Sequence, residues 1–438
     1  MKKSKFFAAL ILFSLVGQIA WVVENMYFNV FIYKMFNASA ADISLMVEAS
    51  AVAATLTTIF IGALSDRLGK RKIFMCLGYI LWGVSILAFA FIRLDLISPL
   101  AASAAGAASI AITAVIILDC VMTFFGSSAN DAAYNAWLTD MTDSGSRGRA
   151  EGINSMMPLV AILVVFGGFM GFDLDKAESW TAIYVIIGAA VIVIGALGFL
   201  IAEEPASVKR DELGLFAVAF YGFRPSVIRE RKELYFTLAG FIIFGISIQV
   251  FMPYLIIYYE KTLGMSDYVL IMAPAIICAA AVTFFYGRAI DRMGPERALL
   301  PPLAMLTAGY VLLFTFPGLF KTEGFAMKLP VFIGSLLMMS GYLTGMAVFG
   351  TKIRNETPEA MAGRFQGLRI IAQVLIPGVV GPAIGAAVLK NAPTVTNGDG
   401  TTSFLPSNAI FMAALIVLAV LGAAYLIYRI ARKKHEEA

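Results

Sequence analysis

Charged residues, histidine and cysteine are all scarce in this sequence of 438 residues. Charged residues make up 14% of the chain, against roughly a quarter in an average soluble domain. Hydrophobic residues make up 60%, which is more apolar surface than a soluble fold of this length can hide. Lipid accepts such a surface, so the composition excludes a soluble protein and predicts an integral membrane protein.

Histidine is represented once, by His435 near the C-terminus. Its absence from the apolar segments argues against a histidine proton relay, a zinc site and a Ser–His hydrolase. The cysteines, Cys76, Cys120 and Cys278, lie singly within apolar runs, where small buried residues are common. We therefore expect neither an enzyme nor a bound metal or cofactor.

Long apolar runs dominate the rest of the chain and predict twelve membrane spans. Crossing the hydrocarbon takes about 20 residues as a helix, and a spanning helix satisfies its own backbone hydrogen bonds. The first run is too long for a signal peptide, so we expect it to be retained. The predicted spans are 6–33, 43–65, 73–92, 109–137, 153–172, 180–202, 234–259, 268–288, 298–318, 329–351, 366–389 and 405–430.

The basic residues are distributed unequally between the two sides of these spans. Most of the 33 Lys and Arg residues fall on the side of the N-terminus, which predicts that both termini are cytoplasmic, in the plasma membrane. Because they lie in short clusters between apolar runs, they indicate loops facing a membrane and not a nucleic-acid surface. The exceptions are Lys34, Arg93, Lys176, Lys261, Lys321, Lys328 and Lys390.

A short polar motif occurs twice. Gly62–Lys72 reads GALSDRLGKRK, and a degenerate copy reads GRAIDRMGPER at 287–297. A second pair begins at Thr142 and Thr357. The repeats divide the chain into an N-terminal six-helix bundle, a cytoplasmic linker and a C-terminal six-helix bundle, at 1–202, 203–233 and 234–438. Many secondary transporters are built from such duplicated halves, so we expect a transporter of a small-molecule substrate, acting as a monomer.

The motif at Gly62–Lys72 resembles the signature loop between the second and third helices of the major facilitator superfamily, G-x-L-[AS]-D-[RK]-x-G-[RK]-[RK]-[RK]. This resemblance implies the twelve-helix major facilitator fold. The stretch Asn130–Asp140, followed by Arg147 and Arg149, is similar to the fourth helix and next loop of the glycoside–pentoside–hexuronide cation symporters and the sucrose–proton symporters. That similarity implies sugar uptake driven by a proton or sodium ion.

The symporter families place acidic residues on helices one, two and four, where this chain has Glu24, Glu48 and Asp119. A carboxylate at mid-membrane costs about 2.5–3.5 kcal/mol on insertion scales, and no Lys or Arg lies in the apolar cores of the first six spans. These residues are the predicted ion-coupling set. Glu48 stands alone on helix two, where many of the symporters have two Asp one turn apart, so we favour a proton over sodium. A structural hydrogen bond by a neutral acid is the alternative.

The centres of the spans also lack a Lys or Arg that would bind a phosphate or dicarboxylate, because Arg288 and Arg369 lie at inner ends, and this favours a neutral or cationic solute. Amide, hydroxyl and aromatic groups suit a sugar, and nearly as well a lipophilic drug. Pro253 can break the seventh helix near its polar residues, and Trp180 is expected in the aromatic belt at the membrane surface. The predicted substrate-binding residues are Gln18, Trp21, Asn25, Gln249, Tyr254, Tyr258 and Gln373.

Charged residues of the repeats stand where helices leave the membrane. Carboxylates there can pair with cations or with a helix N-terminus, and contacts that form in one conformation and break in another act as a gate. The alternative is that they only set topology. The predicted gating residues are Asp66, Arg67, Arg71, Arg149, Asp291, Arg292 and Arg364.

The sequence thus predicts a proton-coupled sugar importer. The first alternative is a proton-coupled exporter of drugs or metabolites. Exporters of the superfamily carry G-x-x-x-G-P-x-x-G-G in helix five, which is absent there, although a partial form occurs at Gly378–Gly385. The alternative from another class is a non-transporting membrane sensor.

Overall fold

The computed structural model describes residues 3–101, 103–142, 147–205, 220–319, 325–357, 362–397 and 400–436. Within these ranges, twelve helical segments are long and apolar enough to cross a membrane. They coincide with the predicted spans, which confirms the all-α membrane fold. The segments are Lys5–Phe36, Ala40–Ser65, Lys72–Phe91, Ala104–Asp140, Gly152–Phe169, Ala177–Ile201, Lys232–Thr262, Val269–Ile290, Arg297–Thr315, Lys328–Glu356, Gly367–Leu389 and Ala409–Ile427.

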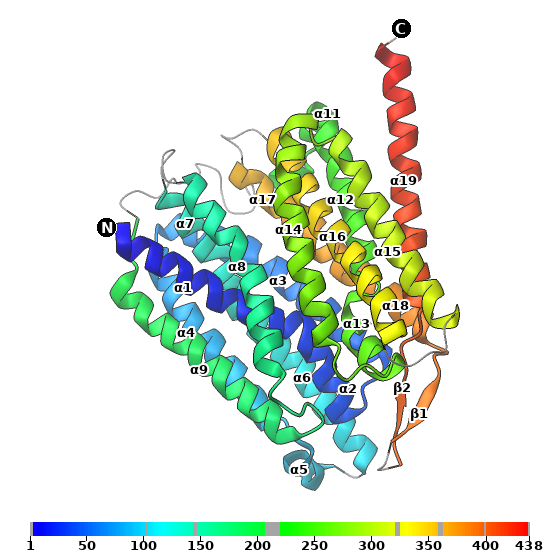
Figure 1. The fold of residues 1–438 in the computed structure, drawn as a ribbon. Coiled ribbons are helices and arrows are strands. Elements are labelled where there is room, and N and C mark those ends of the chain that lie inside the picture. The colour runs from blue at the N-terminus through cyan, green and yellow to red at the C-terminus, as the bar shows by residue number, and fades with distance from the viewer. Residues whose placement is uncertain are drawn as a thin grey trace. The chain divides into compact units, whose positions relative to one another are not determined.

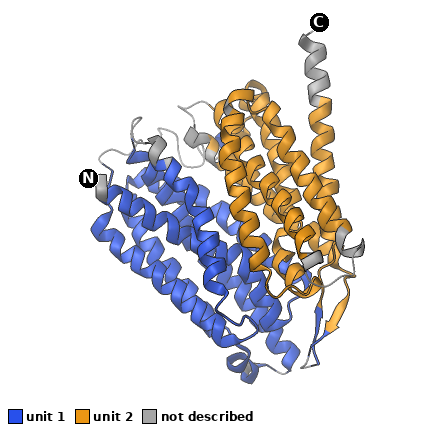
Figure 2. Ribbon diagram, in the orientation of Figure 1, with its two compact units in different colours: residues 1–221, 396–403 blue, residues 222–395, 404–438 orange. Residues whose placement is uncertain are grey.

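The chain forms two compact units (Figure 2). Unit 1 contains Met1–Tyr221 together with Thr396–Ser403, and unit 2 contains Gly222–Val395 together with Phe404–Ala438. Each unit therefore holds six of the spans. The change of unit falls within the linker that the sequence predicts at 203–233, of which residues 206–219 lie outside the described part of the chain.

Unit 1 is built from continuous apolar helices joined by short polar turns (Figure 1). Its first and fourth spans each combine α-helical and π-helical pieces. The elements are α1 (Lys3–Val22), η1 (Val23–Tyr27), α2 (Phe28–Phe36), α3 (Ala40–Leu68), α4 (Lys72–Ala88), η2 (Phe89–Phe91), α5 (Leu94–Ile97), η3 (Ser98–Leu100), α6 (Ala104–Gly126), η4 (Ser127–Tyr134), α7 (Asn135–Asp140), α8 (Arg147–Phe169) and α9 (Ala177–Ile201).

Unit 2 repeats this pattern and adds a small hairpin before its last helix. The helix break expected at Pro253 is present, because α12 ends at Gln249 and a 3₁₀ turn follows. The elements from Tyr221 onward are η5 (Tyr221–Phe223), α11 (Pro225–Glu230), α12 (Lys232–Gln249), η6 (Met252–Tyr254), α13 (Leu255–Ile257), η7 (Tyr258–Thr262), α14 (Val269–Met293), η8 (Arg297–Leu299), α15 (Leu300–Leu319), α16 (Phe325–Glu356), α17 (Ala362–Ile370), η10 (Ile371–Leu375), α18 (Ile376–Leu389), β1 (Thr394–Thr396), β2 (Thr402–Phe404) and α19 (Ala409–Glu436).

The π-helical turns η1, η4, η7 and η10 interrupt four of the spans. A π turn adds one residue to a helix, redirects the side chains around it and is frequent at functional sites. η1 holds Glu24 and Asn25, η7 holds Tyr258, and η10 holds Gln373. Four predicted site residues therefore lie where the regular helix is interrupted.

Close helix packing in unit 1 depends on glycine. A Cβ at Gly83 of α4 would lie 2.6 Å from the carbonyl oxygen of Gly188 in α9, and a Cβ at Gly188 would lie 2.8 Å from the carbonyl oxygen of Gly83. These two helices can approach this closely because neither residue has a side chain, as in other membrane helix pairs.

Candidate functional site

Two of the three predicted ion-coupling carboxyl groups come together inside unit 1. Glu24 in η1 is 7% exposed, and Asp119 in α6 is 2% exposed. The hydroxyl oxygens of Ser50 and Thr123 both lie 2.8 Å from Oε1 of Glu24 and 2.8 Å from each other. Asp119 is near enough to interact electrostatically with Glu24. Residues from three spans thus form one buried polar cluster, the Glu24–Asp119 pair with its two hydroxyls.

Each carboxyl group of this pair keeps one oxygen without a partner. Among the described residues, Oε2 of Glu24 and Oδ1 of Asp119 are buried and make no hydrogen bond. None of the ion pairs formed by described Lys and Arg residues involves Glu24 or Asp119. A buried carboxyl group without a cationic partner must be protonated or bind a cation, so the pair can hold or release a positive charge.

Glu48 lies apart from this pair. It is half-buried in α3 and accepts a hydrogen bond from the hydroxyl of Ser44, one turn earlier in the same helix. It makes no hydrogen bond to Glu24 or Asp119. The structure therefore brings together two members of the predicted set and leaves the third as a separate group.

A hydrogen-bonded chain crosses unit 1 next to the pair. The indole Nε1 of Trp21 donates to Oδ1 of Asn130 over 3.2 Å, and Nδ2 of Asn130 donates to the hydroxyl of Tyr79 over 2.6 Å. The Tyr79 hydroxyl in turn donates to the carbonyl of Phe13 over 2.6 Å. Gly17 leaves room for this chain, because a Cβ there would lie 2.4 Å from both Asn130 Nδ2 and the Tyr79 hydroxyl. The hydrogen bond to Asn130 of η4 thus fixes the orientation of the Trp21 side chain.

The other polar residues predicted on the first span have different surroundings. Gln18 is half-buried, and Asn25 is exposed and donates from Nδ2 to the carbonyl of Trp21 over 2.8 Å. Asn25 therefore presents its amide at the surface of unit 1, one turn beyond Trp21.

Asp131 is a site residue that the sequence analysis missed. It lies in η4, is half-buried and accepts a hydrogen bond of 2.9 Å from Ser127. It interacts electrostatically with Glu24. The exposed Asn135 donates to the Asp131 carbonyl over 3.1 Å and continues the polar face one turn further. The signal was present, because Asp131 is a carboxylate inside a predicted span, like Asp119.

In unit 2, two predicted substrate residues lie where α12 and η6 meet α18. Gln249 is half-buried, and a Cβ at Gly381 would lie 2.4 Å from its Cβ. Tyr254 is buried, and its hydroxyl donates to the carbonyl of Pro382 over 3.3 Å. Tyr254 therefore serves packing between the helices, while Gln249 has an accessible side chain.

The remaining two predicted residues of unit 2 lie in π turns. Tyr258 is buried, and its hydroxyl makes no hydrogen bond to any described residue. Gln373 is half-buried in η10. An unpartnered buried hydroxyl is unfavourable unless a ligand or water binds it, which makes Tyr258 the strongest substrate candidate in this unit.

Among the predicted gating residues, Arg71 has the best-defined contacts. It is 3% exposed, donates from Nε to Oδ2 of Asp140 over 2.9 Å and from Nη1 to the hydroxyl of Ser65 over 2.8 Å. The carboxylate of Glu204 accepts hydrogen bonds from the backbone N–H groups of Arg71 and Lys72. Glu204 thus caps the N-terminus of α4, where a negative charge is stabilised.

The other predicted gating residues are less informative. Arg67 and Arg292 are exposed. The side chains of Asp66, Arg149, Asp291 and Arg364 lie outside the described residues. In unit 2, a cluster that the sequence analysis did not identify places Lys352 Nζ 3.8 Å from carboxylate oxygens of both Glu296 and Glu356. Unit 1 therefore has a short, hydrogen-bonded ion pair between Arg71 and Asp140, whereas the charged groups around Lys352 in unit 2 lie further apart.

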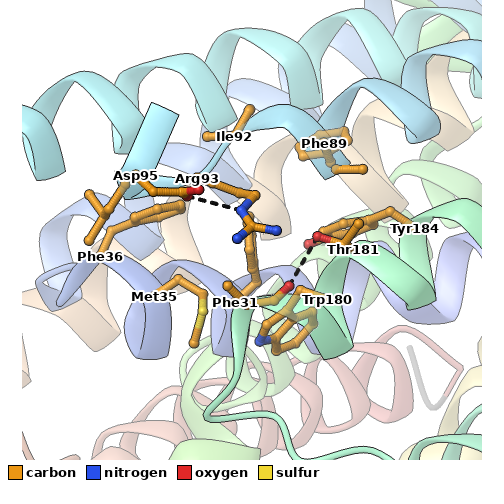
Figure 3. Close-up of a pocket in the computed structure, with 13 residues that line it drawn as sticks. Phe31, Met35, Phe36, Phe89, Ile92, Arg93, Asp95, Trp180, Thr181 and Tyr184 are labelled. Atoms are coloured by element: carbon orange, nitrogen blue, oxygen red, sulfur yellow. Dashed lines mark hydrogen bonds and ion pairs between the residues drawn. The ribbon is translucent and has the colours of Figure 1, made fainter. Parts of the chain in front are cut away.

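A cavity of about 120 Å³ lies in unit 1, between α2, the segment after α4 and the start of α9. Figure 3 shows the residues that line it. Arg93 at its rim forms an ion pair of 3.0 Å with Asp95, and this hydrogen bond lowers the pKa of Asp95. The walls are mostly apolar, and Arg93, Asp95 and Thr181 are their charged and polar members. The large wall residues are Phe31, Phe36, Phe89, Trp180 and Tyr184.

Trp180 corrects one expectation. It is 1% exposed, its ring centroid lies 5.1 Å from that of Phe31, and its indole Nε1 donates to the carbonyl of Leu174 over 2.9 Å. It is therefore a core residue of unit 1, and the prediction that it belongs to an aromatic belt is wrong. Hydropathy placed it at a span end but could not show that neighbouring helices cover it.

The described residues contain no group of three or more His, Cys, Asp or Glu side chains that could hold a metal ion. The chemistry available in the spans of unit 1 is therefore that of paired carboxyl groups, hydroxyls and amides.

Comparison with known proteins agrees with this architecture. Residues 6–382 match the family model of the Major Facilitator Superfamily. A class C tetracycline resistance protein of Escherichia coli is 25% identical over 301 residues, which cover 67% of this chain and 70% of that protein. A bacterial homolog of the human lysosomal transporter Spinster, solved in an inward-facing, unoccupied conformation, is similar with a TM-score of 0.70 and 18% identity, covering 98% of this chain and 97% of that one. The xylose transporter XylE from E. coli gives a TM-score of 0.67 at 14% identity, over 97% of each chain. At such identities the structural likeness shows the fold alone.

Proposed function

Because the chain belongs to the major facilitator superfamily, and is therefore a multi-pass secondary transporter of a small molecule across a lipid bilayer, we propose that it imports a neutral solute, a sugar, together with a proton. The Glu24–Asp119 pair is the observation that carries this proposal. Both groups are buried, and each keeps one oxygen without a described partner. A proton that binds from one side of the membrane and leaves to the other would supply the missing partner.

Each unit, taken by itself, holds polar groups of the kind that bind such a solute. In unit 1, Asn25 and Asn135 are exposed and Asp131 is half-buried, all within membrane spans. Polar groups at this depth are unfavourable in hydrocarbon, so they line a water-filled pathway. In unit 2, Tyr258 and Gln373 supply a hydroxyl and an amide. Acceptors, donors and aromatic faces of this kind suit a polyhydroxylated neutral solute.

We also propose that the protein is a monomer in the plasma membrane, with both termini in the cytoplasm. The orientation follows from the concentration of Lys and Arg on that side of the spans. Asp131, which lies on the polar face and interacts with Glu24, links substrate occupancy to the charge of the pair. Asp66, Arg67, Arg149, Asp291, Arg292 and Arg364 remain gating candidates beside Arg71.

Transport by purified protein in proteoliposomes tests the proposal. We expect labelled xylose, galactose or sucrose to accumulate when the outside is acidic, and not when a sodium gradient replaces the pH gradient. Glu24→Gln and Asp119→Asn should abolish uphill accumulation while sparing downhill counterflow, because binding need not fail when coupling does. Glu48→Gln is the matched control and should accumulate substrate like the parent. Accumulation by all three variants would show that the carboxyl groups are structural.

A proton-coupled exporter is the second candidate, and the similarity to a tetracycline resistance protein favours it. The two candidates differ in direction. An exporter would load tetracycline into inside-out vesicles in a manner that depends on the pH gradient, and would accumulate none of the sugars. A protein that moves neither class of solute in either direction would show that both substrate proposals are wrong.

A further inference from the structure

The segment between α18 and α19 belongs partly to each unit. Its strands β1 and β2 pair in a two-stranded hairpin. Residues 396–403 cluster with unit 1, although the chain before and after them clusters with unit 2 (Figure 2). The chain therefore leaves unit 2, joins unit 1 for a few residues and returns.

Asn37, at the end of α2, holds this segment through all the polar atoms of its side chain. Its Oδ1 accepts hydrogen bonds from Asn397 Nδ2 over 3.0 Å and from the Ser403 hydroxyl over 2.9 Å. Its Nδ2 donates to the Thr401 hydroxyl over 3.0 Å. Asn397 also donates to Thr401 and Ser403, over 3.0 and 2.8 Å. The four side chains form one polar cluster, in which Ser403 is 6% exposed.

The backbone of Asn37 alone would not require this side chain. Asn37 has φ 53° and ends α2 in the left-handed conformation, with its N–H bonded to the carbonyl of Ile32. Glycine is the usual residue at such a helix end, and Asn is tolerated. Glycine would satisfy the backbone but could not bind the hairpin, so the amide has a role beyond capping the helix.

The base of the hairpin is fixed separately, within unit 2. The Thr262 hydroxyl donates to the carbonyl of Pro406 over 2.6 Å, and the N–H of Leu405 donates to the carbonyl of Pro393 over 2.7 Å. The base is thus held in part by main-chain groups. The hydrogen bonds that join Asn37 to the hairpin are all between side chains, and each such bond contributes only about 1 kcal/mol because folding exchanges it for a bond to water.

We propose that hairpin 394–404 is a releasable latch, held on unit 1 by Asn37 in one conformation and freed from it in another during transport. A transporter with two halves works by moving one half against the other. A segment fixed in both units must then stretch or let go at its weaker attachment, which is the Asn37 cluster. This inference rests on the family and the hairpin contacts, and not on the identity of the substrate or coupling ion.

Hydrogen exchange of the protein in lipid nanodiscs tests the latch without any substrate. In the parent, we expect amides of 394–405 to exchange through a local opening, while those of α18 and α19 stay protected. Asn37→Gly keeps the left-handed backbone and removes the amide, and should speed exchange of this segment about tenfold, since several weak hydrogen bonds are lost together. Val395→Ala, at a side chain that is 40% exposed on the same hairpin, is the matched control. Equal exchange in Asn37→Gly and the parent would refute the role of Asn37.

A reversible cross-link tests whether release is needed for transport. Asn37→Cys combined with Ser403→Cys places one thiol at the position of the Ser403 hydroxyl and the other one bond short of the Asn37 oxygen, which lies 2.9 Å from that hydroxyl. Oxidation should arrest transport and reduction should restore it, whereas the parent, with Cys76, Cys120 and Cys278 alone, should be unaffected. Transport is scored as sugar uptake and as tetracycline loading, so a wrong substrate proposal shows in the parent itself. Undiminished transport by the oxidised variant would show that transport does not need the hairpin to be released, and would overturn the proposal.

Discussion

The interiors of the two units differ in the polar groups that they bury. Among the described residues, the spans of unit 1 bury the carboxyl groups of Glu24 and Asp119, whereas the corresponding interior of unit 2 buries hydroxyls, such as Tyr258 and the Tyr259–Ser335 pair. A tyrosine hydroxyl, with an ordinary pKa near 10, stays neutral at physiological pH, while a carboxyl group can change its charge. Near their π turns, unit 1 therefore buries groups that can change their charge, and unit 2 buries groups that stay neutral.

The units differ again where their helices leave the membrane. Arg71 of unit 1 contacts Asp140 over 2.9 Å and Ser65 over 2.8 Å. In unit 2, Lys352 lies 3.8 Å from each of two carboxylates, which is beyond hydrogen-bonding distance. The planar guanidinium of Arg71 fixes the orientation of the side chains that it contacts. The ammonium group of Lys352 neutralises the nearby carboxylates but does not fix their orientation.

Breaking the Arg71 cluster gives the largest effect that we expect. Arg71→Ala leaves Asp140 with 14% of its side chain exposed and no described cation, and removal of one partner of a buried ion pair costs about 3 kcal/mol. The free energy of unfolding, measured by titration with sodium dodecyl sulfate in mixed micelles, should fall by about that amount.

Arg67→Ala is the control for this measurement, because Arg67 carries the same charge in the same loop and is exposed. Its effect should stay within about 0.5 kcal/mol. If the two variants lost equal stability, the loss would come from the net charge of the loop and not from the Arg71–Asp140 contact.

Glycine substitutions compare the packing of the two units at an intermediate level. Gly381→Ala forces a Cβ against the Cβ and backbone of Gln249, at 2.4 and 2.8 Å, and should cost about 2 kcal/mol, since the backbone must shift. Gly17→Ala meets the Asn130 amide and the Tyr79 hydroxyl, which are side-chain ends that can yield, and should cost about 1 kcal/mol. Thermal unfolding in detergent measures both.

Gly152→Ala controls for the change of residue, because a Cβ there would have no neighbour within 4 Å. Alanine is the better helix former, so this variant should be equal to or slightly more stable than the parent. A loss of stability at Gly152 as large as at Gly381 would mean that the close approach of Gly381 to Gln249 does not matter.

The fold could be predicted because it depends on features that are local in the sequence. Apolar runs of sufficient length gave the twelve spans, and the repeated loop around Asp66 and Asp291 indicated two halves. The helix break at Pro253 follows from the missing N–H of proline. The exposure of Asn25, by contrast, follows from a π turn that composition does not reveal.

The site was predicted only in part, because its contacts join residues far apart in the chain. The rarity of buried charge identified Glu24 and Asp119, and the same criterion would have found Asp131. It could not show that Ser50 and Thr123 would meet Glu24, or that Trp180 would be covered by Phe31. Those contacts depend on the rotation of each helix about its axis, which packing sets and a nearly all-apolar helix surface does not reveal.

The smallest effect that we expect concerns Tyr258 in unit 2. Its buried hydroxyl has no described partner, so Tyr258→Phe removes an unsatisfied group and should keep or slightly raise the free energy of unfolding. If the hydroxyl binds the transported sugar, KM for uptake should rise about fivefold with little change in the maximal rate, because one net hydrogen bond of about 1 kcal/mol is lost from the bound state.

Tyr259→Phe is the matched control. Its hydroxyl lies 2.7 Å from that of Ser335, so the variant should lose about 1 kcal/mol of stability and keep its KM. The opposite pattern, with KM changed at Tyr259 and not at Tyr258, would move the substrate contact of unit 2 to the other face of this helix.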